Sequence, residues 1–171
     1  MLPDAIELIV VTPERQLLRE TVLEVTIPGL GGELGVLPGH APLMTELGIG
    51  ELTYRTATSA RPTPLSVIRG FAEVLPDRVT VLAETAERAE EIDVNRAEAA
   101  LARAEKRLAS NDTNIDWDRA AVALQRAVIR IQIVRKYRGA PIASSWPLAL
   151  LILSPGCERF SLVLSSGFRK P

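Results

Sequence analysis

The hydrophobic repeat of this chain changes once, near residue 86. Before that point apolar residues alternate with their neighbours in four short segments: Ile6 to Val10, Val25 to Ile27, Leu52 to Tyr54 and Val79 to Ala83. A repeat of two residues is typical of strands with one buried face. After that point apolar residues recur in steps of three and four, which is typical of amphipathic helices. The sequence therefore predicts an α+β protein, with strands first and helices after them.

The strand-forming part is interrupted by turn residues at close intervals. Pro28-Gly29, Gly31-Gly32, Pro38-Gly39 and Pro76-Asp77 are examples. Short alternating segments separated by such turns predict an antiparallel sandwich or barrel. We assign residues 1–86 to this β domain, which is long enough for one thin core.

Residues 87–139 are predicted to form an antiparallel helical hairpin, with helices of about 17 and 23 residues. The predicted apolar stripes are Ala97, Leu101, Ala104 and Leu108 in the first helix, and Trp117, Ala121, Leu124, Val128 and Ile131 in the second. Asp93 and Asp116 precede the helices as N-caps, and the polar segment 110–114 separates them.

The predicted seam between the helices is weak, because alanine buries little apolar area. The second helix has another apolar stripe, formed by Val122, Ile129 and Ile133. Two stripes on one helix indicate two contact partners. We therefore expect the hairpin to pack on a neighbour and to be able to leave it.

Residues 140–171 fit neither pattern. Prolines at 141, 147, 155 and 171 prevent a continuous helix, and the apolar run from Pro147 to Leu153 has no period. We expect this segment to be poorly ordered or loosely docked. A membrane-surface anchor is the alternative, although the segment lacks an amphipathic basic face.

Composition excludes several classes of function. A net charge of −1 over 171 residues argues against a generally basic nucleic-acid binder. One His and one Cys exclude an internal disulfide and a Cys/His zinc site, and leave His40 as the only histidine for a Ser-His or Cys-His site. No apolar run approaches the ~20 residues of a membrane-spanning helix. We see no secretory signal, and a reducing compartment is expected.

Charge is distributed unevenly along the chain. The net charge is −5 for residues 1–85, +2 for residues 86–139 and +2 for residues 140–171. Of the 20 cationic side chains, 17 are Arg. Codon composition is one explanation for this bias. The other is use of the planar guanidinium group to bind carboxylate or phosphate.

Four stretches together resemble the ε subunit family of bacterial F-type ATP synthase. They are Gly32 to Leu43, Val11 to Glu14, Gly70 to Val74 followed by Val79 to Ala83, and Ala86 to Asp93. The resemblance extends over about residues 3–138. It implies a β-sandwich followed by a helical hairpin in a non-catalytic central-stalk subunit that serves ATP synthesis driven by hydrogen ion transport. The complex would lie on the cytoplasmic face of the bacterial plasma membrane, with this subunit as a peripheral component.

The resemblance also implies the partners. The sandwich would bind the γ subunit and the c-ring, and the hairpin would either fold onto the sandwich or extend along γ. In the extended state its basic residues would face an acidic segment of the catalytic β subunit and block ATP hydrolysis. The implied rotor interface comprises Gly35, Val36, Leu37, Pro38, Gly39, His40, Ala41, Pro42 and Leu43.

A finer resemblance concerns ATP, which some members of the family bind on the folded hairpin. The segment Ile92 to Ala97 matches the motif Ile/Leu-Asp-x-x-Arg-Ala in full. By resemblance the ATP contacts are Glu87, Ile92, Asp93, Arg96, Ala97, Arg103, Arg126 and Arg130. The chain has no Gly-x-x-x-x-Gly-Lys loop, so side chains would have to hold the phosphates. No cofactor or metal is required, and ATP would be a regulatory ligand.

Each assignment has a simpler alternative. His40 is expected to be structural or at an interface rather than catalytic, and Cys157 an incidental free thiol. Asp93 serves as a cap whether or not it contacts ATP. For Arg96, Arg103, Arg126 and Arg130 the alternative to an ATP site is a basic surface that is solvated or faces the β subunit, and the two roles can coexist in different states of the hairpin. The rival functions are a free-standing adaptor or nucleotide-sensing module, and, less favoured, an enzyme.

Overall fold

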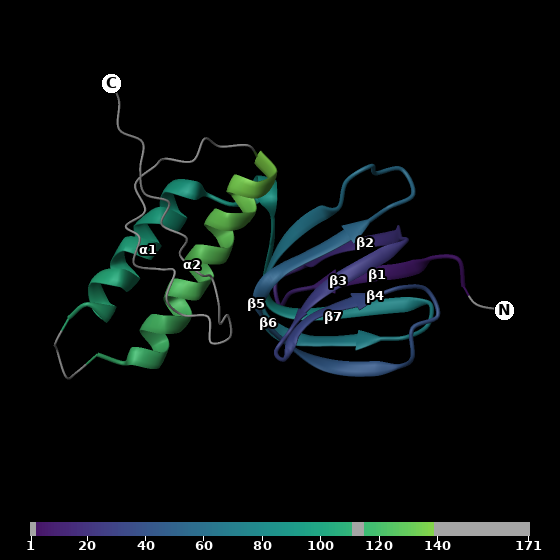
Figure 1. The fold of residues 1–171 in the computed structure, drawn as a ribbon, viewed down its shortest axis with the longest axis horizontal. Coiled ribbons are helices and arrows are strands. Elements are labelled where there is room, and N and C mark those ends of the chain that lie inside the picture. The colour runs from purple at the N-terminus through teal and green to yellow at the C-terminus, as the bar shows by residue number, and fades with distance from the viewer. Residues whose placement is uncertain (1–2, 111–114, 139–171) are drawn as a thin grey trace, which may run out of the picture. The chain divides into compact units, whose positions relative to one another are not determined.

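The computed structural model describes residues 3–110 and 115–138 (Figure 1). Seven strands come first: β1 (Ile6–Val11), β2 (Gln16–Val22), β3 (Glu24–Gly29), β4 (Gly32–Val36), β5 (Leu43–Arg55), β6 (Thr63–Val74) and β7 (Arg78–Arg88). A 3₁₀ turn, η1 (Ala89–Glu91), leads to the helices α1 (Val94–Leu108) and α2 (Trp117–Arg138). The predictions for residues 140–171 lie outside the described residues.

The strands form one hydrogen-bonded sheet in the order β2-β1-β7-β6-β5-β3-β4. Neighbouring strands are antiparallel except β1 and β7, which pair in parallel from Glu7 with Arg78 to Val11 with Leu82. The inner faces of the sheet enclose one apolar core drawn from β1 to β7. The predicted fold class, a β-sandwich followed by two helices, is confirmed. The parallel pair was not predicted, because alternation does not specify strand direction.

The four alternating segments are strands, and their alternate side chains are buried. Ile6, Leu8 and Val10 of β1 are each 0% exposed, and the same holds for Val79 and Val81 of β7. Alternation did not locate β2, β4 or β6. In β6 five consecutive residues from Pro64 to Ile68 are buried, so its burial pattern has no period of two.

Burial from Pro64 to Ile68 is continuous because both faces of this part of β6 are covered. Leu65 and Val67 point into the sandwich core. Ser66 and Ile68 lie on the opposite face and are each 1% exposed. Helix α2 contacts β6 and β5, so it covers this outer face. The second partner predicted for α2 is therefore the sandwich, and the first is α1.

The three long strands change face at one level of the sheet. In β6 the core residues are Leu65 and Val67 before Arg69, but Ala72 and Val74 after Gly70. Strand β5 likewise buries Leu47 and then Leu52 and Tyr54, and β7 buries Ala83 and then Ala86. The change in β6 coincides with positive φ at Arg69 (54°) and Gly70 (128°). We call this level the crease.

Each helix begins directly after the Asp residue that the sequence predicts as its N-cap. The backbone N–H of Arg96 donates to Asp93 Oδ1 at 3.0 Å, and that of Arg119 donates to Asp116 Oδ1 at 2.9 Å. In α1, Ala97 and Ala104 of the predicted stripe are buried, whereas Leu101 and Leu108 are half-buried.

The stripe predicted for α2 is partly wrong. Trp117 is 49% exposed and Ala121 is exposed. The buried positions are Ala120, Ala127, Ile131, Ile133 and Val134. Apolar residues surround much of this helix because it packs on α1 and on the sandwich. Periodicity alone could not distinguish the stripe facing α1 from one a residue away.

A second apolar cluster packs α2 on the segment that connects β7 to α1. It contains Ala89 of η1, Ile92, and Ile133 and Val134 of α2, and it is separate from the sandwich core. Complete burial of a side chain such as Ile133 contributes about 1.5–3 kcal/mol. Polar contacts reinforce it at the end of α2, where Lys136 Nζ donates to Glu51 Oε2 at 3.1 Å and the Tyr137 hydroxyl donates to Glu51 Oε1.

Replacement of Gly70 should test the crease. A Cβ at this position would lie 2.0 Å from the carbonyl oxygen of Leu82, and the φ of 128° disfavours any L side chain. We expect Gly70→Ala to lower the free energy of unfolding by about 3 kcal/mol or more, measured by urea denaturation. Gly31→Ala is the matched control, because a Cβ there meets nothing within 4 Å. Equal stability of the two variants would contradict this account.

The two tyrosines should report the packing of the two clusters. Burial raises the pKa of Tyr54, and burial together with the hydrogen bond to Glu51 raises the pKa of Tyr137, both above the ordinary 10.0. The folded state therefore favours the protonated phenols, and their stabilising contribution is lost as the pH rises above 10. We expect an ultraviolet titration to give higher phenolate midpoints in the folded chain than in denaturant, with Tyr137→Phe removing one of them. Coincident midpoints would refute the packing described here.

Candidate functional site

A pocket of about 310 Å³ lies where β7, η1, α1 and α2 meet. Its wall is rich in charged groups from all four elements. The lining residues are Glu87, Glu91, Asp93, Arg96, Ala97, Ala100, Arg103 and Arg130. The closed hairpin assembles this pocket, because no single element contributes all of its charges.

Six of the eight residues assigned to ATP by resemblance line this pocket. They are Glu87, Asp93, Arg96, Ala97, Arg103 and Arg130. Ile92 does not line the pocket: it is 4% exposed and belongs to the cluster that packs α2 on the segment after β7. Arg126 does not line it. The structure thus brings residues from positions 87 to 130 together around one cavity.

Local geometry explains how these side chains are positioned. Asp93 is fixed by its cap on α1, which directs the carboxylate toward the first turn. Arg96 and Arg103 are seven residues apart, so two helical turns place them on one face. Arg130 reaches across from α2, and its Nε donates to Glu87 Oε2 at 2.5 Å.

The pocket holds guanidinium groups that other described residues do not neutralise. Among the described residues, the side chains of Arg96 and Arg103 form no ion pair and no hydrogen bond. Arg130 is paired with Glu87, and both side chains are at most 32% exposed. Such a site suits an anion that accepts charge-assisted hydrogen bonds, such as a phosphate group.

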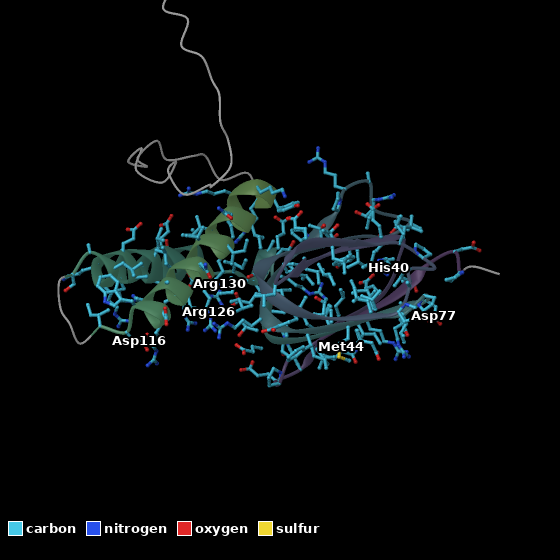
Figure 2. All side chains as sticks on the ribbon, turned by 60° about the horizontal axis from the view of Figure 1, so that its bottom comes forward. His40, Met44, Asp77, Asp116, Arg126 and Arg130 are labelled. Carbon is cyan, nitrogen blue, oxygen red and sulfur yellow. The ribbon has the colours of Figure 1, made fainter. Side chains whose placement is uncertain are left out.

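Arg126 lies one turn before Arg130 on α2 (Figure 2). Its environment differs from that of Arg130. Its Nη2 is 3.5 Å from Glu84 Oε2 on β7, and its buried Nε has no hydrogen-bond partner among the described residues. It lines a neighbouring cavity together with Arg69 and Arg119. Sequence spacing placed Arg126 and Arg130 on one face, and the structure gives them different carboxylate partners.

The segment Gly35 to Leu43 spans the end of β4, a loop and the start of β5. His40 lies away from the helices in Figure 2, near Asp77. The loop is fixed by hydrogen bonds from Gly39 N to Pro76 O at 2.7 Å and from His40 N to Leu37 O at 3.1 Å. Leu37 is 59% exposed and Leu43 is 39% exposed, whereas Val36 is buried in the core. The exposed surface of this segment therefore comes from the loop and the start of β5.

A second apolar surface was not found by the sequence analysis. A groove of about 740 Å³ follows the crease, and Leu30, Phe71 and Leu82 line it. These three side chains are each more than half exposed. Phe71 and Leu82 are cross-strand partners on β6 and β7. Leu82 is outside by ordinary alternation with Val81 and Ala83. Phe71 is outside only because β6 changes face at Arg69 and Gly70, and strict alternation does not signal such a change.

Two family models together match most of the chain. The β-sandwich domain of the ATP synthase delta/epsilon chain matches residues 5–89, and the long α-helix domain of the same chain matches residues 90–135. The chain belongs to the ATP synthase delta/epsilon chain family. The resemblance proposed from the sequence is thereby confirmed.

Individual relatives of this family agree over the same region. The ATP synthase epsilon chain of Syntrophobacter fumaroxidans is 49% identical over 133 residues, which are 78% of this chain and 98% of the relative. The ATP synthase epsilon chain of Solibacter usitatus is 50% identical over 135 residues, which are 79% of this chain and 99% of the relative. A chain in the Euglena gracilis mitochondrial ATP synthase structure (OSCP/F1/c-ring, rotational state 1) is 27% identical with a TM-score of 0.67, covering 75% of this chain and 80% of that one.

Family membership identifies the chain as an epsilon-type, non-catalytic stalk subunit rather than an enzyme. Within the described residues, no cluster of three or more His, Cys, Asp or Glu side chains is arranged to hold a metal ion. Neither of the two helices that the structure describes is long and apolar enough to span a bilayer.

Proposed function

We propose that this ATP synthase subunit couples rotation of the c-ring, driven by proton flow, to the catalytic head, and that its hairpin regulates ATP hydrolysis. The γ subunit and the c-ring are its proposed partners on the rotor. Family membership supports this proposal, together with two exposed apolar surfaces on the sandwich. These surfaces are the loop from Gly35 to Leu43 and the groove at the crease.

The hairpin is the proposed regulatory element. It is held to the sandwich by the small cluster around Ile92 and Ile133, by the contacts to Glu51, and by Arg130 with Glu87. Release of these few contacts would let the hairpin extend along γ. Residues 86–139 carry a net charge of +2, which suits an acidic segment of the catalytic β subunit in the extended state.

ATP is the proposed regulatory ligand of the closed hairpin, and no other cofactor is required. The observation that carries this proposal is the pocket lined by Arg96 and Arg103 of α1 and by Arg130 of α2. A polyphosphate there would bridge the two helices and the end of β7. Since the pocket exists only with the hairpin closed, ATP would shift the population toward the closed form.

The proposed location is peripheral, on the cytoplasmic face of the bacterial plasma membrane, through the synthase complex. The alternative function is a free-standing adaptor or ATP-sensing module outside the synthase. Co-purification of the chain with the γ subunit distinguishes the two, because only the stalk subunit requires that association.

Titration with ATP should test the pocket. We expect Arg103→Ala and Arg130→Ala to weaken ATP binding by about tenfold or more, because each loses a charge-assisted contact with phosphate. Arg107→Ala is the control, since Arg107 is an exposed cation of α1 that does not line the pocket. Isothermal titration calorimetry on the full chain measures these affinities.

The Arg126→Ala variant tests whether Arg126 leaves Glu84 to contact the bound phosphates. If it does, Arg126→Ala loses as much affinity for ATP as Arg130→Ala. Unchanged affinity in both Arg103→Ala and Arg130→Ala would remove the proposed site.

Assembly with γ should test the loop surface. We expect Leu37→Glu to weaken capture of purified γ subunit by about tenfold, because a charge would replace an apolar side chain at the interface. Trp117→Glu is the control, since Trp117 is a comparably exposed apolar residue on the hairpin. Capture of γ at wild-type strength by Leu37→Glu, measured by pull-down at matched concentrations, would refute this interface.

A further inference from the structure

The proposed nucleotide pocket contains three carboxylates as well as three guanidinium groups. Carboxylates near a polyphosphate repel it, so each needs an ion pair or a hydrogen bond that offsets its negative charge. Glu87 is paired with Arg130, and Asp93 accepts the backbone N–H of Arg96. Glu91 has a cationic partner from outside the pocket: Arg15 Nη2 lies 2.9 Å from Glu91 Oε2.

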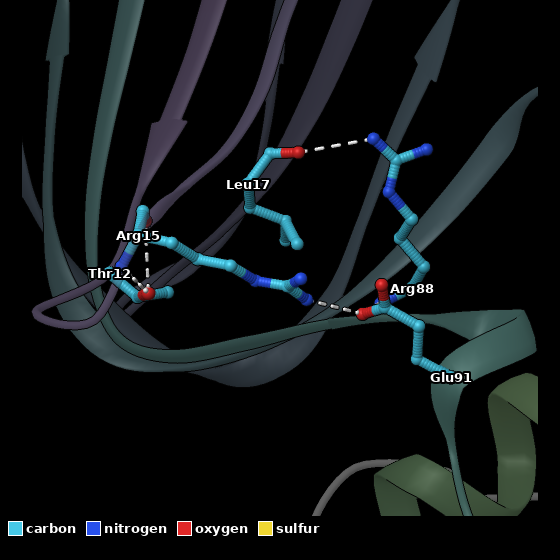
Figure 3. A network of polar contacts seen from close by, with 5 residues as sticks. All are labelled: Thr12, Arg15, Leu17, Arg88 and Glu91. Carbon is cyan, nitrogen blue, oxygen red and sulfur yellow. Dashed lines mark hydrogen bonds and ion pairs between the residues drawn. The ribbon is translucent and has the colours of Figure 1, made fainter.

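Arg15 belongs to the turn between β1 and β2, 76 positions away from Glu91 in the sequence (Figure 3). Thr12 fixes the turn, since its backbone N–H donates to Arg15 O at 2.9 Å and its hydroxyl accepts from Arg15 N at 3.3 Å. Nearby, Arg88 Nη2 donates to Leu17 O at 3.1 Å. The sandwich thus presents the Arg15 side chain toward η1 from a fixed backbone.

Glu91 is held from two directions. Its carboxylate accepts from Arg15 and lies 3.5 Å from the backbone N of Arg88, at the start of η1. In the absence of Arg15, this carboxylate would be free to approach Arg96 and Arg103 in the same pocket. It would then compete with phosphate for those guanidinium groups.

We propose that Arg15 is a positioning residue for the nucleotide pocket: it neutralises Glu91 and keeps its carboxylate away from the phosphate-binding arginines. This inference rests on the proposed binding of ATP. It adds a sandwich residue, outside the hairpin and outside the motif from Ile92 to Ala97, to the determinants of nucleotide affinity.

The exposure of Arg15 and Glu91 sets how much ATP affinity the loss of Arg15 should cost. The side chain of Arg15 is 58% exposed and that of Glu91 is 38% exposed, so solvent screens their charges. We therefore expect Arg15→Ala to weaken ATP binding by about threefold to tenfold at low ionic strength. Added salt should reduce this difference, because it screens charges separated by several ångströms.

The test is a double-mutant cycle on the full chain, with ATP binding measured by calorimetry. Glu91→Gln removes the charge but retains a side chain able to cap η1. We expect Arg15→Ala to weaken binding, Arg15→Lys to retain most of the affinity, and Arg15→Ala/Glu91→Gln to recover to within about twofold of wild type. Glu91→Gln should strengthen binding more in the Arg15→Ala background than in the wild type.

Arg19→Ala is the matched control. Arg19 is on the neighbouring strand and pairs with Glu7 at 2.8 Å, with side chains 62% and 37% exposed. Equal affinities of wild type, Arg15→Ala and Arg19→Ala would overturn the inference but leave the proposed ATP site intact. Equal gains from Glu91→Gln in both backgrounds would also overturn it. Failure of the wild-type chain to bind ATP would overturn the proposed ATP function and this inference together.

Discussion

Burial of Ile92 and Ile133 between η1 and α2 is the contact on which the arrangement of this protein depends. The sandwich has its own closed core, and the two helices share a seam lined largely by alanine. The small cluster around these two residues packs α2 on the segment that follows β7. The contact of α2 with β5 and β6 and the ion pairs that Glu51, Glu84 and Glu87 make with α2 add to it. The cluster around Ile92 and Ile133 stabilises the closed hairpin by a few kcal/mol. This is enough to populate the closed form, yet small enough for the hairpin to be released.

The charged pocket is a consequence of that contact. Its arginines come from both helices, and its carboxylates come from the end of β7, η1 and the cap of α1. With the hairpin released, Arg130 of α2 would no longer meet Glu87 at the end of β7. Docking and ligand binding are therefore linked: a ligand that needs arginines from α1 and α2 together stabilises the docked hairpin by its own binding free energy. Arg15 extends this linkage into the sandwich.

Sequence reasoning succeeded where one physical rule acts alone. A half-buried strand such as β1 alternates, and Asp93 and Asp116 cap their helices as their positions predict. It failed where two constraints meet. Strand β6 is covered on both faces as far as Ile68 and changes face at Arg69 and Gly70, so neither its existence nor the exposure of Phe71 follows from alternation. The motif indicated which residues surround the pocket, but only tertiary structure separates Arg126 from Arg130 and brings Arg15 to Glu91.

Native-state hydrogen exchange of the full chain tests the central claim most directly. The account predicts that amides of α1 and α2 exchange through an opening that costs less free energy than global unfolding, while the central strands β5 to β7 exchange only on global unfolding. It also predicts that ATP slows exchange in the helices and leaves the strands unchanged. Exchange of helices and strands in a single event, at one free energy, would contradict a hairpin that leaves the sandwich.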